Sequence, residues 1–124
     1  MQDFKELQVW RKAHALALSV YRATRTDPGR HHAELVGQAR RAALSVAANI
    51  AEGAGRGSGP DFARFLAMSV GSANELESHL LIARGAGLIS RKDADSIMPC
   101  IHEIRRMLIS LMRSVRARSE NRDH

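Results

Sequence analysis

Residues 38–56 of this chain combine an alanine-rich composition with a continuous stripe of polar side chains. At about 100° per residue, the stripe falls within roughly 80° of a helix surface. It consists of Gln38, Arg41, Ser45, Asn49, Glu52 and Arg56. A separate, apolar arc holds Leu35, Val36, Ala39, Ala42, Ala43, Val46, Ala47 and Ile50. The segment therefore predicts an amphipathic helix whose small residues allow a neighbouring helix to approach closely.

The polar stripe is unlike an ordinary solvated helix face, which would be rich in Lys and Glu. It mixes amide, hydroxyl, guanidinium and carboxylate groups at i,i+3 and i,i+4 spacing, so that neighbouring side chains can hydrogen-bond one another. Such a face is expected to meet something polar. Another subunit, a neighbouring helix and a nucleic acid all remain open.

Helical periodicity recurs along the whole chain, and recognisable strand runs are absent. A chain of 124 residues is expected to form a single domain over 1–124. The apolar spacing predicts helices at about 4–24, 31–54, 60–85 and 91–118, with a polar tail over 117–124 that should fray. Four amphipathic helices joined by short connections predict an all-α, antiparallel up-down-up-down four-helix bundle.

Local signals mark where the helices begin and end. Asp27-Pro28-Gly29 has the composition of a turn. The run GAGRGSG over 53–59 ends the second helix, and it lacks the preceding strand and the lysine of a nucleotide-binding loop, so we expect a helix connector. Ser58 and Ser90 should cap the third and fourth helices, and Gly85 and Gly87 should close the third. Pro99 should kink or restart the fourth helix.

The charge balance is basic. Nineteen Lys and Arg residues against thirteen Asp and Glu residues give a formal net charge of +6. A basic protein attracts polyanions, because neutralising phosphates releases their counterions. The same charge could equally serve solubility. The net charge is thus compatible with nucleic-acid binding but does not require it.

The chain carries the marks of a cytoplasmic protein. The single cysteine, Cys100, cannot form an intramolecular disulfide, which fits a reducing compartment. Lys5, Arg11 and Lys12 interrupt any apolar core of a signal peptide. No run approaches the ~18 apolar residues that span a bilayer. We therefore expect a cytoplasmic location and no membrane partner.

Catalytic and metal motifs are weak. Di-metal sites in helix bundles need Glu-x-x-His on two helices, whereas Glu75 and His79 are four residues apart and Glu103 directly follows His102. Cys100 lies between apolar seam residues and should behave as a small, buried or half-buried hydrophobe. We therefore expect a protein without metal or cofactor, and not an enzyme.

The third helix adds Ser72, Glu75 and His79 to one side at spacings of three and four. They could form an exposed polar face with local hydrogen bonds. Alternatively, Glu75 pairs with Arg40 or Arg41 across a helix or subunit interface.

Arginines crowd the fourth helix on the side away from its Ile/Leu seam. They are Arg105, Arg106, Arg113 and Arg116. This side could be a solvated face whose cations complement the negative end of the helix. It could also be a surface that follows a line of phosphates. Aromatic stacking partners are absent, so any nucleic-acid contact should be electrostatic and sensitive to salt.

These residues resemble a known family, the four-helix-bundle proteins encoded in intervening sequences of bacterial 23S rRNA genes. The matching positions lie at 4–10, 38–46, 49–53, 56, 62, 65–66 and 71–76, and they include Arg40-Arg41 and the run Asn49-Ile50-Ala51-Glu52-Gly53. The resemblance implies an antiparallel bundle that assembles into a homopentameric ring. A related branch, the accessory proteins of diversity-generating retroelements, partners a reverse transcriptase and binds nucleic acid through a basic surface.

Residues and resemblance together predict a non-enzymatic oligomer, associated with RNA through arginines that its ring presents. Five copies would multiply the formal charge of +6 fivefold, which makes salt-dependent binding plausible. The alternative is a structural or adaptor ring that binds a protein partner without nucleic acid.

Overall fold

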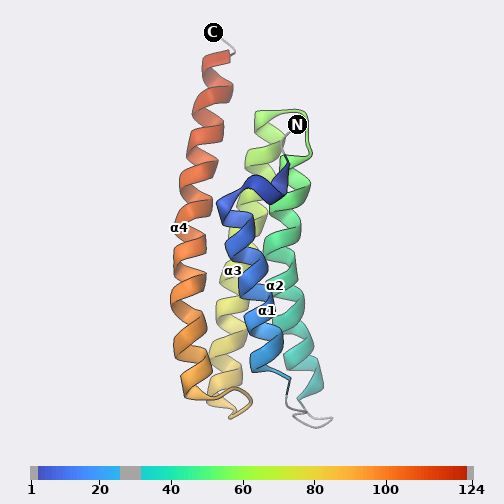
Figure 1. Ribbon diagram of the computed structural model, residues 1–124, viewed down its shortest axis with the longest axis vertical. Coiled ribbons are helices and arrows are strands. Elements are labelled where there is room, and N and C mark those ends of the chain that lie inside the picture. The colour runs from blue at the N-terminus through green and yellow to red at the C-terminus, as the bar shows by residue number, and fades with distance from the viewer. Residues whose placement is uncertain (1–2, 26–31, 123–124) are drawn as a thin grey trace.

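The computed structural model describes residues 3–25 and 32–122, and these residues form helices and no β-strand (Figure 1). A short 3-10 helix, η1 (Phe4–Glu6), precedes α1 (Gln8–Ala23), α2 (Ala33–Ala54), α3 (Gly59–Gly85) and α4 (Arg91–Arg122). Each of the four α-helices contacts the next in sequence, and α1 also contacts α4. The all-α class is confirmed.

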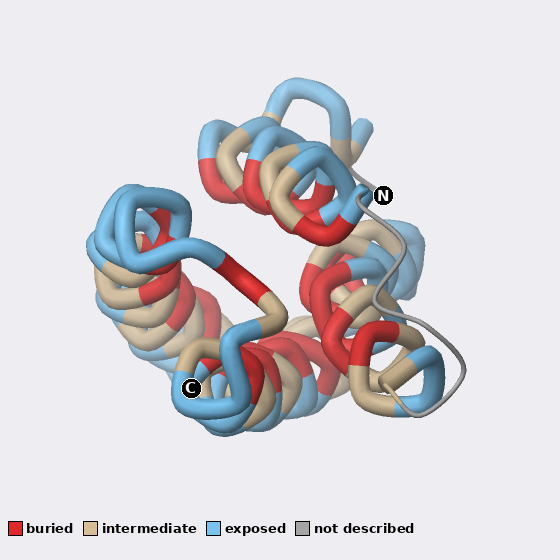
Figure 2. The backbone as a smooth tube through the Cα atoms, turned by 90° about the horizontal axis from the view of Figure 1, so that it is seen from below, coloured by how far each residue is buried: buried red, intermediate tan, exposed pale blue. Residues whose placement is uncertain are grey.

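Figure 1 shows that consecutive helices alternate in direction and that the C-terminal turns of α4 extend past the start of α1. The contacts between α2 and α3 agree with opposite directions of the two helices. Ser45 contacts Ser72, whereas Gly53, later in α2, packs against Phe65, which lies earlier in α3. The view along the bundle in Figure 2 shows the buried residues on the inward sides of all four helices.

Inward-facing residues of the four helices form one continuous hydrophobic cluster, with Leu16, Ile50, Leu66, Leu76, Leu80, Ile101, Ile104 and Leu108 among its most deeply buried members. The repeating apolar positions predicted for α3 and α4 supply many of these side chains. Ser69 of α3 is a fully buried polar residue, and its Oγ donates to the Val46 carbonyl of α2 at 2.8 Å. That bond satisfies a hydroxyl that would otherwise be costly to bury.

The predicted caps of α3 and α4 are confirmed. Ser58 Oγ accepts from the Asp61 amide at 3.2 Å, and Ser90 Oγ accepts from the Asp93 amide at 3.0 Å. Gly87 takes a φ of +76°, and the Leu88 amide donates to the Ala83 carbonyl at 2.8 Å. Glycine adopts this left-handed conformation without a steric penalty, because it has no Cβ. Gly87 therefore ends α3 and lets the chain turn toward α4.

Some predicted boundaries differ from the structure. Leu7 is extended and separates η1 from α1, because the Asp3 side chain accepts from the Lys5 amide and holds a separate turn. The helix at 31–54 begins at Ala33, and the turn predicted at 27–29, like His31, lies outside the described residues. The first and second helices otherwise match the prediction closely.

The prediction of a frayed tail from 117 onward is wrong as far as residue 122, because α4 continues to Arg122. Val115 is still buried there, and Ser119 packs against Gly59 at the start of α3, so the last turns of α4 have a neighbour. Pro99 does not restart α4, which runs through it unbroken. The amide that proline lacks would have bonded Asp95, an exposed residue whose carbonyl water can reach.

Candidate functional site

The middle of the α2 polar stripe is bonded within the chain. The Ser45 and Ser72 hydroxyls share a hydrogen bond of 2.8 Å between α2 and α3. Asn49 Nδ2 donates to the Ser45 carbonyl at 2.9 Å and to Ser45 Oγ at 3.0 Å. Of the three partners left open by the sequence, a neighbouring helix therefore accounts for Ser45, while Asn49 is bonded within α2 itself.

The ends of the stripe are more open. Gln38 is half-buried and Arg41 is exposed. Glu52 and Arg56 form an exposed ion pair at 2.8 Å, and the Arg56 guanidinium lies 4.9 Å from the centre of the Phe65 ring. This pair offers a cation at the end of the bundle where α2 meets α3.

Arg40 has a structural role that its sequence position did not reveal. Its Nε donates to Thr24 Oγ1 and its Nη2 to the Thr24 carbonyl, both at 2.9 Å. Its guanidinium also lies 4.7 Å from the centre of the Tyr21 ring. Arg40 thus binds the C-terminal end of α1, where carbonyl groups lack helical partners.

The proposed pairing of Glu75 with Arg40 or Arg41 is wrong within the chain. Glu75 Oε1 instead lies 3.2 Å from His79 Nε2 on the same helix, one turn away. Arg40 is occupied by Thr24, and Arg41 makes no ion pair with another described residue. Within one chain the local polar face holds, and a pairing of Glu75 across a subunit interface stays a prediction.

Three large hydrophobic side chains of α2 and α3 are about half exposed, which the sequence did not predict. Leu44 is 48% exposed, Met68 47% and Ile82 55%. Gly71 lies between Met68 and Ile82 in sequence, and a Cβ added there would meet no atom within 4 Å. These are single exposed hydrophobic positions, which contact with another molecule would remove from water.

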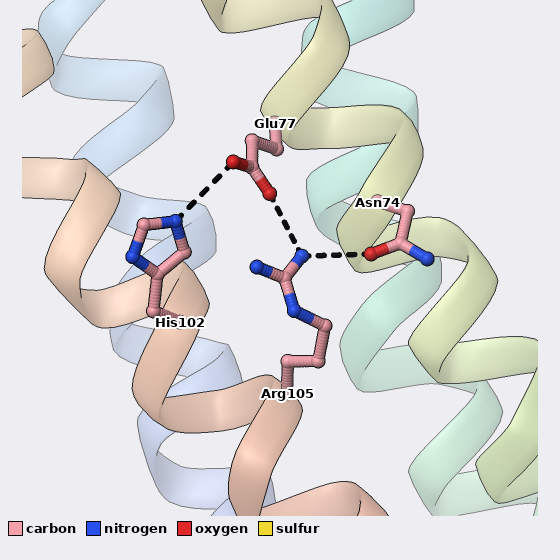
Figure 3. Close-up of polar contacts among 4 residues, drawn as sticks. All are labelled: Asn74, Glu77, His102 and Arg105. Carbon is pink, nitrogen blue, oxygen red and sulfur yellow. Dashed lines mark hydrogen bonds and ion pairs between the residues drawn. The ribbon is translucent and has the colours of Figure 1, made fainter.

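Arg105 is held between α3 and α4 rather than directed to solvent (Figure 3). Its Nη1 donates to Asn74 Oδ1 at 2.7 Å and to Glu77 Oε1 at 2.8 Å, and His102 Nε2 lies 3.2 Å from Glu77 Oε2. Hydrogen bonds from Arg105 and then His102 hold the pKa of Glu77 below its ordinary value. The structure thus gives Arg105 a role that the sequence did not predict, because its Nη1 joins α3 to α4.

The other three arginines predicted on this helix, Arg106, Arg113 and Arg116, are exposed. None of them forms an ion pair with another residue in the described part of the chain. A fourth arginine, Arg64 of α3, lines one cleft with Arg116. Sequence analysis did not select Arg64, because it lies on a different helix from the arginines of α4. A single arginine near the start of the third helix was the one sequence signal for it.

Two observations concern the metal and thiol sites considered in the sequence. Within residues 3–25 and 32–122, no three His, Cys, Asp or Glu side chains gather where they could hold a metal ion. Cys100 is exposed, and its Sγ contacts the Ser96 carbonyl at 3.6 Å, so the prediction of a buried or half-buried thiol is wrong. The reason is that Cys100 projects toward the gap beside α1 rather than into the seam of Ile97 and Ile101.

Across residues 3–25 and 32–122, no helix has the length and apolarity that a bilayer crossing requires.

Comparison with known proteins places these features in a family. A comparison with curated proteins finds no match. A crystal structure from Bacteroides thetaiotaomicron, described as a protein of unknown function from the S23 ribosomal protein family, superposes with a TM-score of 0.77 at 27% identity, covering 84% of this chain and 97% of that one. The family model for 23S rRNA-intervening sequence proteins matches residues 5–110. The protein described here therefore belongs to the family of 23S rRNA-intervening sequence proteins.

Proposed function

We propose that this protein is a non-enzymatic, cytoplasmic oligomer that binds RNA through the exposed arginines of α4. The observation that carries the proposal is the row formed by Arg106, Arg113 and Arg116, whose guanidinium groups are exposed and lack ion-pair partners among the described residues. Carboxylates that neutralised these arginines would have argued for a purely structural role. Glu103 lies near Arg106 but pairs with Lys12, and Glu120 lies near Arg116 without forming an ion pair, so the three guanidinium groups stay available to a polyanion.

The spacing of the row suits a chain of phosphates. Residues 106 and 116 are separated by about 15 Å along a helix that rises 1.5 Å per residue. Arginine matches phosphate oxygens with two parallel N–H donors, so each residue of the row could contact a separate phosphate. No aromatic side chain lies among them to stack on bases. Binding should therefore depend on charge and show little preference for sequence.

Assembly into a ring, which the family resemblance implies, is the second part of the proposal. Leu44, Met68 and Ile82 are about half exposed on the outer sides of α2 and α3, and a second copy of the chain would remove them from water. Assembly would also repeat the arginine row several times, which raises the apparent affinity for a long polyanion.

The absence of catalysis is likewise part of the proposal. Ser45 is the one residue of the stripe that carries a hydroxyl group. This hydroxyl is bonded to Ser72 and Asn49 rather than to a general base. A nucleophilic serine needs a base within hydrogen-bond reach. That arrangement supports a structural role for Ser45 rather than a catalytic one.

The test of RNA binding compares two triple variants of equal charge. One replaces Arg106, Arg113 and Arg116 with Gln, and the matched control replaces Arg22, Arg91 and Lys92, exposed cations at the opposite end of the bundle. Binding to a structured RNA is measured at several salt concentrations. We expect wild-type affinity to fall steeply with salt, and the first variant to lose about 0.7 to 0.9 of logarithmic salt slope per phosphate contact removed. Equal losses in both variants would refute a localised site.

Assembly is tested by molar mass from light scattering. Ile82→Glu places a charge on the proposed contact surface and should dissociate the oligomer, whereas Ala117→Glu, at an exposed α4 position, should leave the mass unchanged. A monomeric wild type at micromolar concentration would contradict the proposal.

A protein partner is the second candidate, and a specific groove favours it. A surface groove of about 500 Å³ runs between the start of α1 and α4, lined by apolar residues that include Leu7, Val9, Met107 and Leu111. Apolar grooves of this kind accept amphipathic segments of other proteins. RNA binding that is absent, or that ignores salt, would favour this adaptor role over the first proposal.

A further inference from the structure

A cleft of about 440 Å³ lies between the first turns of α3 and the last turns of α4. Its walls carry one arginine each, Arg64 from α3 and Arg116 from α4, and Ser119 adds a hydroxyl. Ala63 and Ala67 line the α3 wall, so small side chains leave the space between the two arginines open. The lining therefore offers two guanidinium groups and a hydroxyl as hydrogen-bond donors, together with one carboxylate, that of Glu120.

We propose that this cleft binds a phosphate group, and that the phosphate belongs to the RNA backbone. The inference rests on the RNA binding proposed above and adds a defined site to it. It also assigns a role to Arg64, which lies on a different helix from the arginine row. The cleft would bind one phosphate through several donors, while Arg106 and Arg113 would each contact a neighbouring phosphate of the same RNA strand.

Two contacts with residues of α3 hold the Arg64 side chain in a position where it can bind a phosphate. Its Nε lies 3.5 Å from Asp61 Oδ1, and its guanidinium carbon lies 4.6 Å from the centre of the Phe65 ring. Within the described residues, no ion pair involves its two terminal nitrogens. These nitrogens are the pair that binds phosphate oxygens side by side. Holding the stem in place lowers the conformational entropy that Arg64 loses when it binds.

The opposite wall is fixed by close packing of the two helices. A Cβ added to Gly59 would lie 2.9 Å from Ser119 Cβ and 3.2 Å from Ser119 Oγ. Glycine is therefore needed for the start of α3 to approach α4 so closely. This contact fixes the α4 backbone that carries Ser119 and, one turn earlier, Arg116 against the start of α3.

Two carboxylates are near enough to compete with a phosphate. Asp61 contacts only the Nε of Arg64. Glu120 lines the cleft but forms no ion pair with another described residue, and as the partner four residues after Arg116 it has the weaker orientation for an i,i+4 pair. The backbone amide of Asp61 is already bonded to Ser58, so side chains rather than the α3 N-terminus would hold the phosphate.

The experiment uses the full chain and separates charge from shape. Arg64→Gln removes a cation from the cleft, with Arg91→Gln as its control at the far end of α4. Ala67→Leu fills the cleft without changing charge, with Ala117→Leu as its control on an exposed α4 position. Each variant is titrated with an RNA oligonucleotide at low salt, and its thermal unfolding is recorded alongside.

We expect Arg64→Gln to weaken RNA binding about tenfold, the loss of one charge-assisted contact, and Arg91→Gln to weaken it less than twofold. Ala67→Leu should weaken binding severalfold, while Ala117→Leu should match wild type. If Arg64→Gln behaves like its control, or Ala67→Leu like its own, the cleft proposal fails while RNA binding by the arginine row stands.

A second arm uses inorganic phosphate and distinguishes the source of the ligand. Phosphate should shift the amide resonances of Arg64 and Ser119 in the wild type and leave them unmoved in Arg64→Gln. If wild-type protein binds no RNA, the function proposed above is wrong, and phosphate shifts at these residues would then support a site for a free phosphate or nucleotide. Absence of both RNA binding and phosphate shifts would overturn the cleft proposal entirely.

Discussion

Gly53 offers the sharpest test of how α2 and α3 pack. A Cβ added to this buried glycine would lie 2.8 Å from Phe65 Cβ, 3.0 Å from Phe62 Cδ1 and 3.3 Å from the Phe62 carbonyl oxygen. The first and last of these atoms move only with the α3 backbone. Gly53→Ala should therefore force the two helices apart at their most closely packed end.

Two opposing effects determine the size of the change. In an open helix, alanine is more favourable than glycine by about 0.5 to 1 kcal/mol. Inserting a methyl group into a packed interface costs about 1 to 3 kcal/mol. For Gly53→Ala the cost should exceed the gain, so we expect a net loss of about 1 kcal/mol or more in the free energy of unfolding.

Gly37→Ala is the matched control on the same helix. Its added Cβ would meet only the end of the Arg41 side chain, 3.6 Å away, which is an ordinary contact. This variant should therefore gain stability where Gly53→Ala loses it. Both are measured by urea denaturation at one protein concentration. Equal stabilisation of the two variants would refute the close packing of α2 against α3 at Gly53.

Three further substitutions test single polar contacts. Arg40→Ala should lower the free energy of unfolding by about 1 to 2 kcal/mol, since it removes two hydrogen bonds at the end of α1, while the exposed neighbour Arg41→Ala should change it by less than about 0.5 kcal/mol. Ser69→Ala should cost about 1 kcal/mol in the same denaturation assay, and no loss would mean that the Ser69 hydrogen bond contributes nothing. Glu77→Gln should be destabilising at neutral pH by roughly 1 kcal/mol, because it weakens the contact with Arg105. Since the folded-state pKa of Glu77 is lowered, its contribution is present above the ordinary carboxyl pKa and is lost as pH falls through the lowered value, so wild type and variant should converge in acid; a constant difference would contradict this.

Much of the fold could be predicted because its signals are local. The seam of α4 from Ile97 to Val115 repeats every three or four residues, and helix geometry alone places such residues on one face. Caps at Ser58 and Ser90 depend on a side chain reaching an amide three residues away. Periodicity and capping involve only neighbours in sequence, so a single chain is enough to recognise them.

The candidate site was only partly predictable. The exposed arginines Arg106, Arg113 and Arg116 followed from their position opposite the seam, and so did the expectation for Arg105. The side of a helix that faces away from the core can still meet the flank of the next helix, however. Arg105 does so because Glu77 and Asn74 lie beside it on α3, a relation between residues 28 and 31 positions apart. Sequence spacing within one helix holds no information on that relation.

The amino-acid order thus determined which segments become helices, where most of them end and which side of each faces inward, since each of these depends on a few consecutive residues. The tertiary structure decided which polar groups are already paired and which remain available. Arg40 was committed to Thr24 and Ser45 to Ser72, while Arg64 and Arg116 came to share a cleft. The physical reason is that the rotation and register of one helix against another follow from packing of the whole core, which no single segment specifies.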